Sequence, residues 1–237
     1  MNKKSYKLAV RIPLIITVSV AIVIAVISIF FYILSRNTVT ALLNDQVTDI
    51  AALNTQTVES YLTSMQVYSE SLRDNVLLMR SLGQETAAPM LESALTDVVK
   101  SGRVFSAYFA FEPNEFFPDT PDGLSYYAYT DGGSVAMDVL NDYADYSSGD
   151  YYATTKSIRK THVTEPYSYD LTNGKTVWLI TLSNPITDTS GKFLGVANCD
   201  ILADSIGALD FTTGPYETGY SEILTAEGNR IANTKDS

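Results

Sequence analysis

The sequence has few of the residues that most often carry catalysis or covalent cross-links. It contains one cysteine, Cys199, and one histidine, His162, in 237 residues. A single cysteine excludes an internal disulfide, and a single histidine argues against a histidine-based metal site or a Ser-His-Asp triad. No phosphate-binding loop, nucleophile elbow or zinc-protease motif occurs. We therefore expect no enzymatic activity, no cofactor and no bound metal.

Positive charge is scarce over most of the chain. Residues 37–237 hold all 27 acidic residues and only 11 of the 16 basic ones, which gives this part a net charge of −16. Such a surface repels polyanions, which argues against nucleic acid or an anionic membrane surface as a partner. About 200 residues are enough to bury a hydrophobic core of one or two domains.

Long hydrophobic runs are also missing, with one exception. Residues 12–34 form an uncharged, almost wholly apolar run of 23 residues. As a helix it would be ~35 Å long, which exceeds the ~30 Å hydrocarbon core of a bilayer. Four basic residues precede it, namely Lys3, Lys4, Lys7 and Arg11, and only Arg36 follows closely. The positive-inside rule predicts a cytoplasmic tail over 1–11, a plasma-membrane span over 12–34 and an extracytoplasmic part over 37–237.

A cleaved signal peptide is the alternative interpretation of this run. The apolar core of a signal peptide is only ~7–15 residues long and ends at a small-residue cleavage site. Here the run is longer and ends in the bulky Phe30-Phe31-Tyr32. An uncleaved anchor is therefore favoured.

Residues 37–82 contain neither proline nor glycine, and their apolar residues recur every three or four positions. This spacing predicts a helix of 46 residues, ~70 Å long. Directly after a membrane span, such a helix indicates a stalk that continues the anchor and pairs with a second copy in a homodimer. Packing of the same helix on its own domain is the alternative, and the two are compatible.

The remaining residues predict an α+β domain in which helices cover one face of an antiparallel meander of about five strands. Strands are expected over 104–112, 124–130, 134–140, 163–170, 176–186 and 192–201, and helices over 89–100, 151–160 and 204–209. Asp150 is expected to cap the second of these helices. Asn173-Gly174 is a hairpin signal. A further strand-turn-strand unit begins at Gly219.

The segment TEPYSYDLTNGKTVWLITLSNPITDTSGKFLGVANCDI, residues 164–201, resembles the core of a double Cache (dCache_1) sensor domain. The segment 220–233, YSEILTAEGNRIAN, resembles the first hairpin of its membrane-proximal module. Together with the span and the long helix, this order resembles the N-terminal part of a bacterial methyl-accepting chemotaxis receptor or a related transmembrane sensor. The resemblance implies a PAS-like membrane-distal module over 83–212 and the start of a truncated second module over 213–237.

The resemblance also implies candidate ligand-binding residues. In the amino-acid-binding branch of the family, a Trp-Tyr pair falls on Tyr151 and Tyr152 of this sequence. A later tyrosine matches Tyr167, an acidic position of some members is Tyr169, and a strand-end aspartate that binds the ligand ammonium matches Asp200.

The family arginine that pairs with a ligand carboxylate falls on Gly149 and is lost. No basic residue occurs between Arg103 and Lys156, and acidic residues are frequent over 131–150. We therefore expect a cationic or neutral ligand, such as an amine or a nucleobase-like compound, in preference to a free amino acid or dicarboxylate. A Ca²⁺ site in 131–150 is a weaker alternative, because the spacing is not that of an EF-hand.

Asp200 also stands out without the resemblance. In a regular strand it shares a face with Leu194, Val196 and Asn198. A carboxylate on a mainly apolar face needs a partner, which is either a protein group or a ligand ammonium. Trp178, in mid-strand, is expected in the core, and Cys199 is expected to be a buried thiol.

Three functions follow from these observations. The first is extracytoplasmic sensing by a chemoreceptor, with the ectodomain of a histidine kinase or diguanylate cyclase as the alternative. The second is a membrane-anchored surface protein without a ligand, and the third, disfavoured by the missing motifs, is an exported hydrolase. A receptor also needs a second span and a cytoplasmic signalling domain, so we expect the sequence to be a fragment of a longer protein.

Overall fold

The computed structural model describes residues 3–171, 174–216 and 218–235. The chain divides into two compact units, residues 1–53 and 54–237, which are described separately. The first unit is the N-terminal part of helix α1 (Lys3–Arg80). Large apolar side chains between Ile12 and Leu34 are all about half exposed or more. Among the described residues, α1 is the one helix that is long and apolar enough to cross a membrane.

The predicted span and stalk belong to one continuous helix. Helix α1 contains no glycine, and its single proline, Pro13, lies near its start. It ends at Arg80, two residues before the predicted end, and Gly83 follows with φ +75°. That backbone conformation is one that glycine adopts without strain, so the chain turns sharply there. The expectation that the long helix continues the apolar run is therefore confirmed.

The second unit is built on a seven-stranded antiparallel sheet. Its strands are β1 (Ser106–Phe111), β2 (Leu124–Asp131), β3 (Ser134–Leu140), β4 (His162–Val163), β5 (Tyr167–Asp170), β6 (Thr176–Thr187) and β7 (Phe193–Leu202). They lie in the order β3-β2-β1-β7-β6-β4, and β5 also pairs with β6. The α+β class is confirmed. The predicted simple meander is wrong, because the last long strand, β7, lies beside the first.

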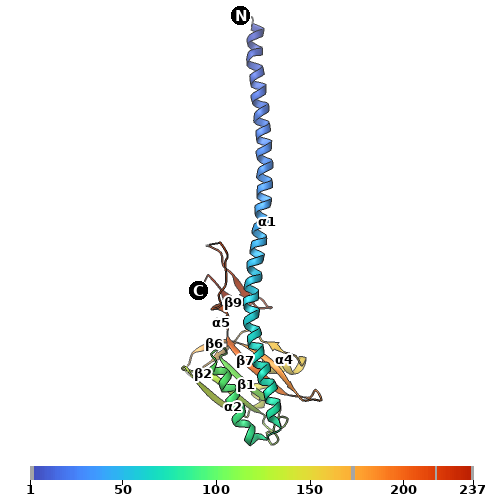
Figure 1. The fold of residues 1–237 in the computed structure, drawn as a ribbon, viewed down its shortest axis with the longest axis vertical. Helices are drawn as coiled ribbons and strands as arrows, with labels where there is room; N and C mark the ends of the chain where they lie inside the picture. Colours follow the sequence, from blue (N-terminus) through green and yellow to red (C-terminus); the bar gives the residue numbers. More distant parts are fainter. Residues whose placement is uncertain (1–2, 172–173, 217, 236–237) are drawn as a thin grey trace. The chain divides into compact units, whose positions relative to one another are not determined.

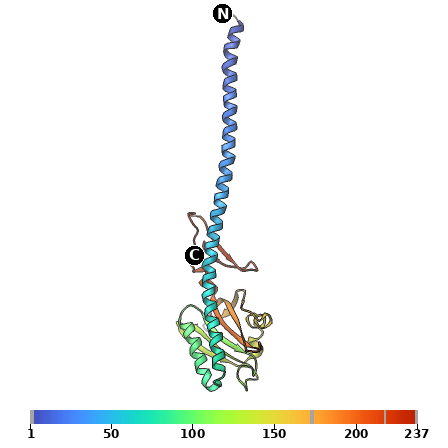
Figure 2. The ribbon, with the colours of Figure 1, turned by 45° about the vertical axis from the view of Figure 1, so that its right-hand side comes forward.

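Helices cover both faces of this sheet, so the prediction that they cover one face is wrong. The C-terminal part of α1 and helix α2 (Gln84–Lys100) lie side by side against one face, and the short helices α3 (Tyr143–Tyr146) and α4 (Asp150–Ile158) lie beyond the other (Figures 1 and 2). The main core lies under α1 and α2 and includes Met65, Leu72, Leu91, Leu95, Phe109, Leu182 and Cys199. A smaller core under α4 contains Ala110, Tyr146, Tyr152, Phe193 and Val196. The sheet therefore has a helix face and an α4 face.

Two predicted helix starts are wrong. Helix α2 begins at Gln84, five residues earlier than predicted, with Pro89 inside it. Proline has no N–H, so the backbone carbonyl one turn earlier lacks its helical donor. Pro89 is exposed, so water can donate to that carbonyl instead. Helix α4 begins at Asp150, and Gly149 is its cap residue. The Asp150 carboxylate accepts hydrogen bonds from Thr154 and pairs with His162, so it does not act as the cap.

The predicted face of Leu194 is also wrong. The pairing of β6 with β7 shifts its register between Ile186 and Thr187, and Gly195 has φ +149°. This bulge inserts one residue into the alternation of β7. As a result Leu194 packs in the core on the helix face, while Asp200 lies on the α4 face with Val196.

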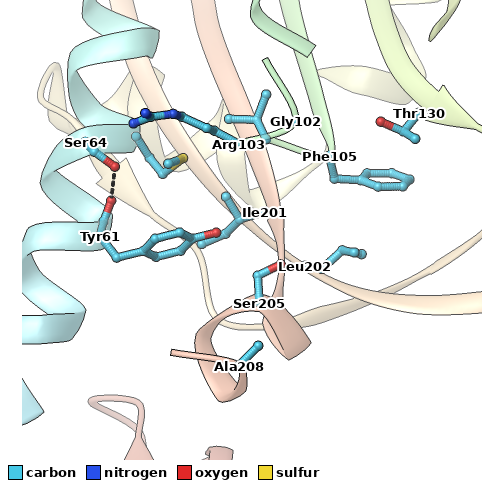
Figure 3. Close-up of a pocket in the computed structure, with 12 residues that line it drawn as sticks. Tyr61, Ser64, Gly102, Arg103, Phe105, Thr130, Ile201, Leu202, Ser205 and Ala208 are labelled. Atoms are coloured by element: carbon cyan, nitrogen blue, oxygen red, sulfur yellow. Dashed lines mark hydrogen bonds between the residues drawn. The ribbon is translucent and has the colours of Figure 1, made fainter. Parts of the chain in front are cut away.

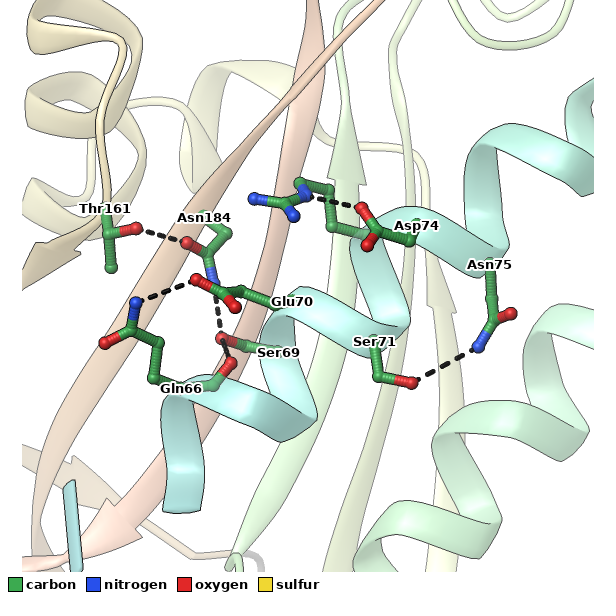
Figure 4. A network of polar contacts seen from close by, with 9 residues as sticks. Gln66, Ser69, Glu70, Ser71, Asp74, Asn75, Thr161 and Asn184 are labelled. Atoms are coloured by element: carbon green, nitrogen blue, oxygen red, sulfur yellow. Dashed lines mark hydrogen bonds and ion pairs between the residues drawn. The ribbon is translucent and has the colours of Figure 1, made fainter. Parts of the chain in front are cut away.

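A buried polar contact joins α1 to the sheet within the second unit. Asn184 of β6 lies in an otherwise apolar row, and its Nδ2 donates to the Oγ of Ser69 on α1 (Figure 4). The Oγ1 of Thr161, in the loop after α4, donates to the Oδ1 of the same asparagine at 2.5 Å. Ser69 and Asn184 are both fully buried. One side chain therefore holds α1, β6 and the end of α4 together.

The last part of the second unit is helix α5 (Ala203–Gly207) and a separate two-stranded sheet of β8 (Glu222–Leu224) and β9 (Arg230–Asn233). Helix α5 begins one residue before Asp204. The strand-turn-strand unit predicted after Gly219 is confirmed. The predicted Asn173-Gly174 turn lies partly outside the described residues. Trp178 is 56% exposed, so its predicted burial is wrong, whereas Cys199 is buried as expected.

The glycine at the bulge gives a test of this fold. A Cβ added at Gly195 would lie 2.3 Å from the carbonyl oxygen of Ala110, and the φ angle disfavours any other residue. We expect Gly195→Ala to destabilise the protein by about 2–4 kcal/mol, measured by urea unfolding followed by tyrosine fluorescence. Gly207→Ala is the matched control, since its Cβ would meet only Ala232 at 3.5 Å. Equal stability of the two variants would contradict the bulge.

Candidate functional site

The candidate site is centred on Asp200, near the end of β7. Its side chain is 2% exposed and faces no cation among the described residues. The Oγ of Ser106 donates to its Oδ2 at 2.5 Å, and the Oγ1 of Thr181 donates to its Oδ1 at 2.6 Å. These residues come from β1 and β6, the two strands that flank β7, and each stands directly opposite Asp200 in the register. The tertiary pairing therefore supplies both hydroxyl donors.

Tyrosines surround this carboxylate on the α4 face. The Tyr167 hydroxyl lies 2.8 Å from Thr181 Oγ1, and it is the donor because the threonine hydrogen is directed to Asp200. The ring of Tyr108 meets the rings of Tyr127 and Tyr151 edge-on, with centroids 5.3 and 5.4 Å apart. Burial and the negative charge of Asp200 both raise the pKa of Tyr108, Tyr151 and Tyr167, so all three stay neutral donors at physiological pH.

The structure separates Tyr151 from Tyr152. Tyr151 lies over Tyr108 and feels the charge of Asp200. Tyr152 is fully buried, packs on Phe193 and donates its hydroxyl to Glu112 at 2.7 Å. Adjacent residues of a helix point about 100° apart, which accounts for the divergence. Of the pair, only Tyr151 is brought to Asp200.

Tyr167 and Tyr169 lie on one face of β5, as expected from their spacing. Tyr167 is half-buried and reaches Asp200 through Thr181, whereas Tyr169 is 36% exposed and its ring lies 6.4 Å from that of Tyr127. Tyr169 is thus at the rim of the tyrosine group. The structure brings together Tyr151, Tyr167, Tyr169 and Asp200 and leaves Tyr152 in the adjacent core.

Beside Asp200 lie buried polar atoms that make no hydrogen bond within the described residues. Both amide atoms of Asn198 and the Oγ of Ser183 have no partner there, and both residues are fully buried. Asn198 stands opposite Tyr108 on one side and Ser183 on the other, two residues before Asp200 on the same face. An unsatisfied buried polar group costs about 1–3 kcal/mol. These atoms add donors and an acceptor beneath the tyrosines.

A cavity of about 520 Å³ opens next to this group. Its lining consists of Gly149, Asp150, Tyr151, Thr164, Glu165, Pro166, Tyr167 and Glu227. Three of these residues are acidic, and none is basic. The basic residue of α4, Lys156, pairs instead with Glu112, with its Nζ 2.6 Å from Glu112 Oε1. The cavity therefore combines aromatic faces with negative charge, a setting that suits a cation or a neutral hydrogen-bonding molecule.

Sequence reasoning missed Ser106, Tyr108, Thr181 and Asn198. Ser106 and Tyr108 alternate within a strand that was expected to be buried, so their shared face could be read from the sequence. Their position beside Asp200 could not, because it depends on the pairing of β1 with β7 across about 90 residues. The described residues contain no cluster of three or more potential metal ligands.

Comparison with known proteins shows that this chain is similar to sensor domains. Residues 91–208 match the family model of the methyl-accepting chemotaxis protein-like first PDC sensor domain. This segment is similar to that sensor domain. Among curated proteins, none matches the sequence.

Solved structures share the fold of this chain. The sensory domain of the Campylobacter jejuni chemoreceptor Tlp3 (CcmL) matches with a TM-score of 0.61 and 17% identity, over 80% of this chain and 70% of that one. The same ligand-binding domain in complex with L-valine matches with a TM-score of 0.60 and 18% identity, over 80% and 70%. The extracellular domain of mmHK1S-Z3, provisionally classed as a histidine kinase, matches with a TM-score of 0.53 and 18% identity, over 74% of this chain and 63% of that one.

The burial of Asp200 predicts a pH-dependent stability. Burial raises its pKa from 3.8 to about 6, although hydrogen bonds from Ser106 and Thr181 oppose the shift. Between those values the folded carboxyl keeps a proton that the unfolded one has released, so stability rises as the pH falls from about 6 to about 4. Above pH 6 the buried charge costs about 3 kcal/mol.

Asp200→Asn removes this titration. We expect the variant to be more stable than the wild type at pH 7, by an amount that shrinks towards pH 4, as measured by urea unfolding at each pH. Asp204→Asn, which removes an exposed carboxylate nearby, should keep the wild-type profile. Parallel profiles for Asp200→Asn and the wild type would show that Asp200 does not titrate in this range.

Proposed function

We propose that the chain is the sensing part of a transmembrane receptor, with a double Cache ectodomain that binds a small molecule outside the cell. The observation that carries this proposal is the buried Asp200 beneath a group of tyrosines in a PDC-type domain. A carboxylate without a protein cation is expensive to bury unless a ligand compensates it. A structural surface protein would gain nothing from this arrangement.

The proposed ligand is an amine or a neutral polar molecule. Its ammonium or N–H group would be taken by Asp200, and the rings of Tyr151 and Tyr167 would enclose it, with Tyr169 at the rim. Tyr152 would act indirectly, because its hydroxyl holds Glu112 and so fixes α4. The Tlp3 domain has been solved with L-valine. A free amino acid also needs a cation for its carboxylate, and the cavity lining at this site offers none.

The proposed membrane arrangement follows from charge and exposure. The apolar run of α1 would span the membrane, with the basic tail in the cytoplasm and 37–237 outside. Between residues 39 and 53 the helix also exposes Val39, Leu42, Leu43, Val47 and Leu53. These residues recur at helical spacing, so they would form the interface of a homodimer.

The proposal includes two types of receptor, which differ in their cytoplasmic signalling domain. A methyl-accepting chemotaxis receptor is the first, on the strength of the family model over 91–208. A histidine kinase is the second, because the mmHK1S-Z3 domain has the same fold. In both cases the signalling domain would lie outside this sequence, and α1 would carry the motion.

Ligand class is tested by calorimetric titration of the chain in nanodiscs. We expect a small amine to bind and Asp200→Asn to weaken it at least about tenfold, since a charge-assisted hydrogen bond is lost. Tyr167→Phe should weaken amine binding less, because it removes only the hydrogen bond from Tyr167 to Thr181 and leaves Asp200 in place. Asp97→Asn, on the exposed side of helix α2 and on the other face of the sheet, is the charge-matched control and should bind as the wild type does. Tight binding of acidic amino acids that Asp200→Ala leaves unchanged would refute the proposed ligand class.

Orientation is tested with a membrane-impermeant maleimide on intact cells. The wild type should not react, because its only cysteine, Cys199, is 1% exposed. Lys160→Cys places a thiol in the exposed segment just after α4 and should be labelled in intact cells. Ser5→Cys, in the basic tail, should be labelled only after lysis. The reverse pattern would overturn the predicted topology.

A further inference from the structure

A second cavity lies on the helix face of the sheet, away from the tyrosine group. Its volume is about 580 Å³. Side chains from α1, the turn after α2, β2, the end of β7 and α5 line it, as Figure 3 shows. The apolar part of the lining includes Met65, Val104, Phe105, Ile201, Leu202 and Ala208. The cavity therefore has a largely apolar wall and is large enough to hold a small organic molecule.

One cation stands at this cavity. Arg103 extends from the turn after α2 toward helix α1 (Figure 3). Its guanidinium makes no hydrogen bond or ion pair with another side chain in the described part of the chain. Such an arginine is unusual in a domain with a large excess of carboxylates. A guanidinium over an apolar wall is suited to bidentate binding of a carboxylate.

Hydroxyl groups complete the polar side of the cavity. The Tyr61 hydroxyl hydrogen-bonds Ser205 of α5, and burial raises the pKa of this tyrosine, so it stays protonated. Ser64 and Thr130 line the same space. We infer that the cavity is a second ligand site, for a small monocarboxylate with an apolar body, and that Arg103 binds the carboxylate.

Strand β7 contributes residues to both the tyrosine group and the second cavity. Asp200 faces the tyrosine group, and the next two residues, Ile201 and Leu202, line the second cavity. The backbone N–H of Phe105, another lining residue, donates to the carbonyl oxygen of Asp200 at 2.8 Å. The second site also contacts α1 directly through Tyr61 and Met65. A carboxylate bound there would touch both the floor of the first site and the helix that leads to the membrane.

The test is calorimetry of the full chain in nanodiscs with phenylacetate at fixed ionic strength. Phenylacetate should bind, whereas the neutral isostere phenylacetamide should bind at least about tenfold more weakly, because the charge-assisted pair is absent. Arg103→Gln should abolish this preference, and Arg103→Lys should restore it in part, since lysine keeps the charge without the fork. Arg103 is exposed, so these variants are expected to fold.

Two further variants separate the site from general charge effects. Lys100→Gln removes an exposed positive charge three residues away, outside the lining, and should leave phenylacetate binding unchanged. Ala208→Leu, in the partly open wall, should block binding while Arg103 is still present. Asp200→Asn should not reduce phenylacetate binding, so this test does not depend on the amine site. No binding by the wild type, or equal binding by Arg103→Gln, would overturn the inference.

Discussion

The pairing of β1 with β7 is the contact on which the rest of the structure depends. It sets Ser106 opposite Asp200 and Tyr108 opposite Asn198, and so it assembles the polar floor of the tyrosine group. The same pairing carries Phe105 and Ile201 to the other face, where they line the second cavity. Because side chains alternate across a strand, one backbone register arranges both the polar floor of the tyrosine group and the wall of the second cavity. A slip of one residue would exchange the two faces and destroy both.

Burial of Asp200 is the main energetic cost of this arrangement. Hydrogen bonds from hydroxyl groups offset part of the lost hydration, but they do not neutralise the charge. The carboxyl pKa therefore stays raised, at about 6. Tyrosine suits the surrounding wall because it brings aromatic area together with a hydroxyl that stays protonated. A buried carboxylate without a protein cation binds a cationic ligand more favourably than a carboxylate that is already neutralised, which is why the proposed ligand is an amine or a neutral molecule.

The C-terminal part of helix α1 packs into the core of the second unit. Its residues Met65, Leu72 and Val76 belong to the main core, and Ser69 is held by Asn184 of β6. Strand β6 also carries Thr181, which binds Asp200. A change at the tyrosine group can therefore reach α1 through a single strand and one buried hydrogen bond, and α4 joins the same contact through Thr161. Packed elements of this kind shift as units, which suits a sensor.

The sequence by itself determined the elements whose signals are local. The absence of proline and glycine from 37–82, together with the apolar run before it, predicted the long helix, and the strand patterns predicted the α+β class and most of the strands. The resemblance in 164–201 predicted Tyr167 and Asp200 as ligand-binding residues, and the structure brings the two close together. Only the tertiary structure decided the strand order, the bulge at Gly195, the divergence of Tyr151 from Tyr152 and the roles of Ser106 and Thr181 beside Asp200. Helical periodicity and strand alternation can be recognised within a few neighbouring residues. The neighbours of a buried carboxylate, in contrast, depend on pairing between segments that are far apart in the chain.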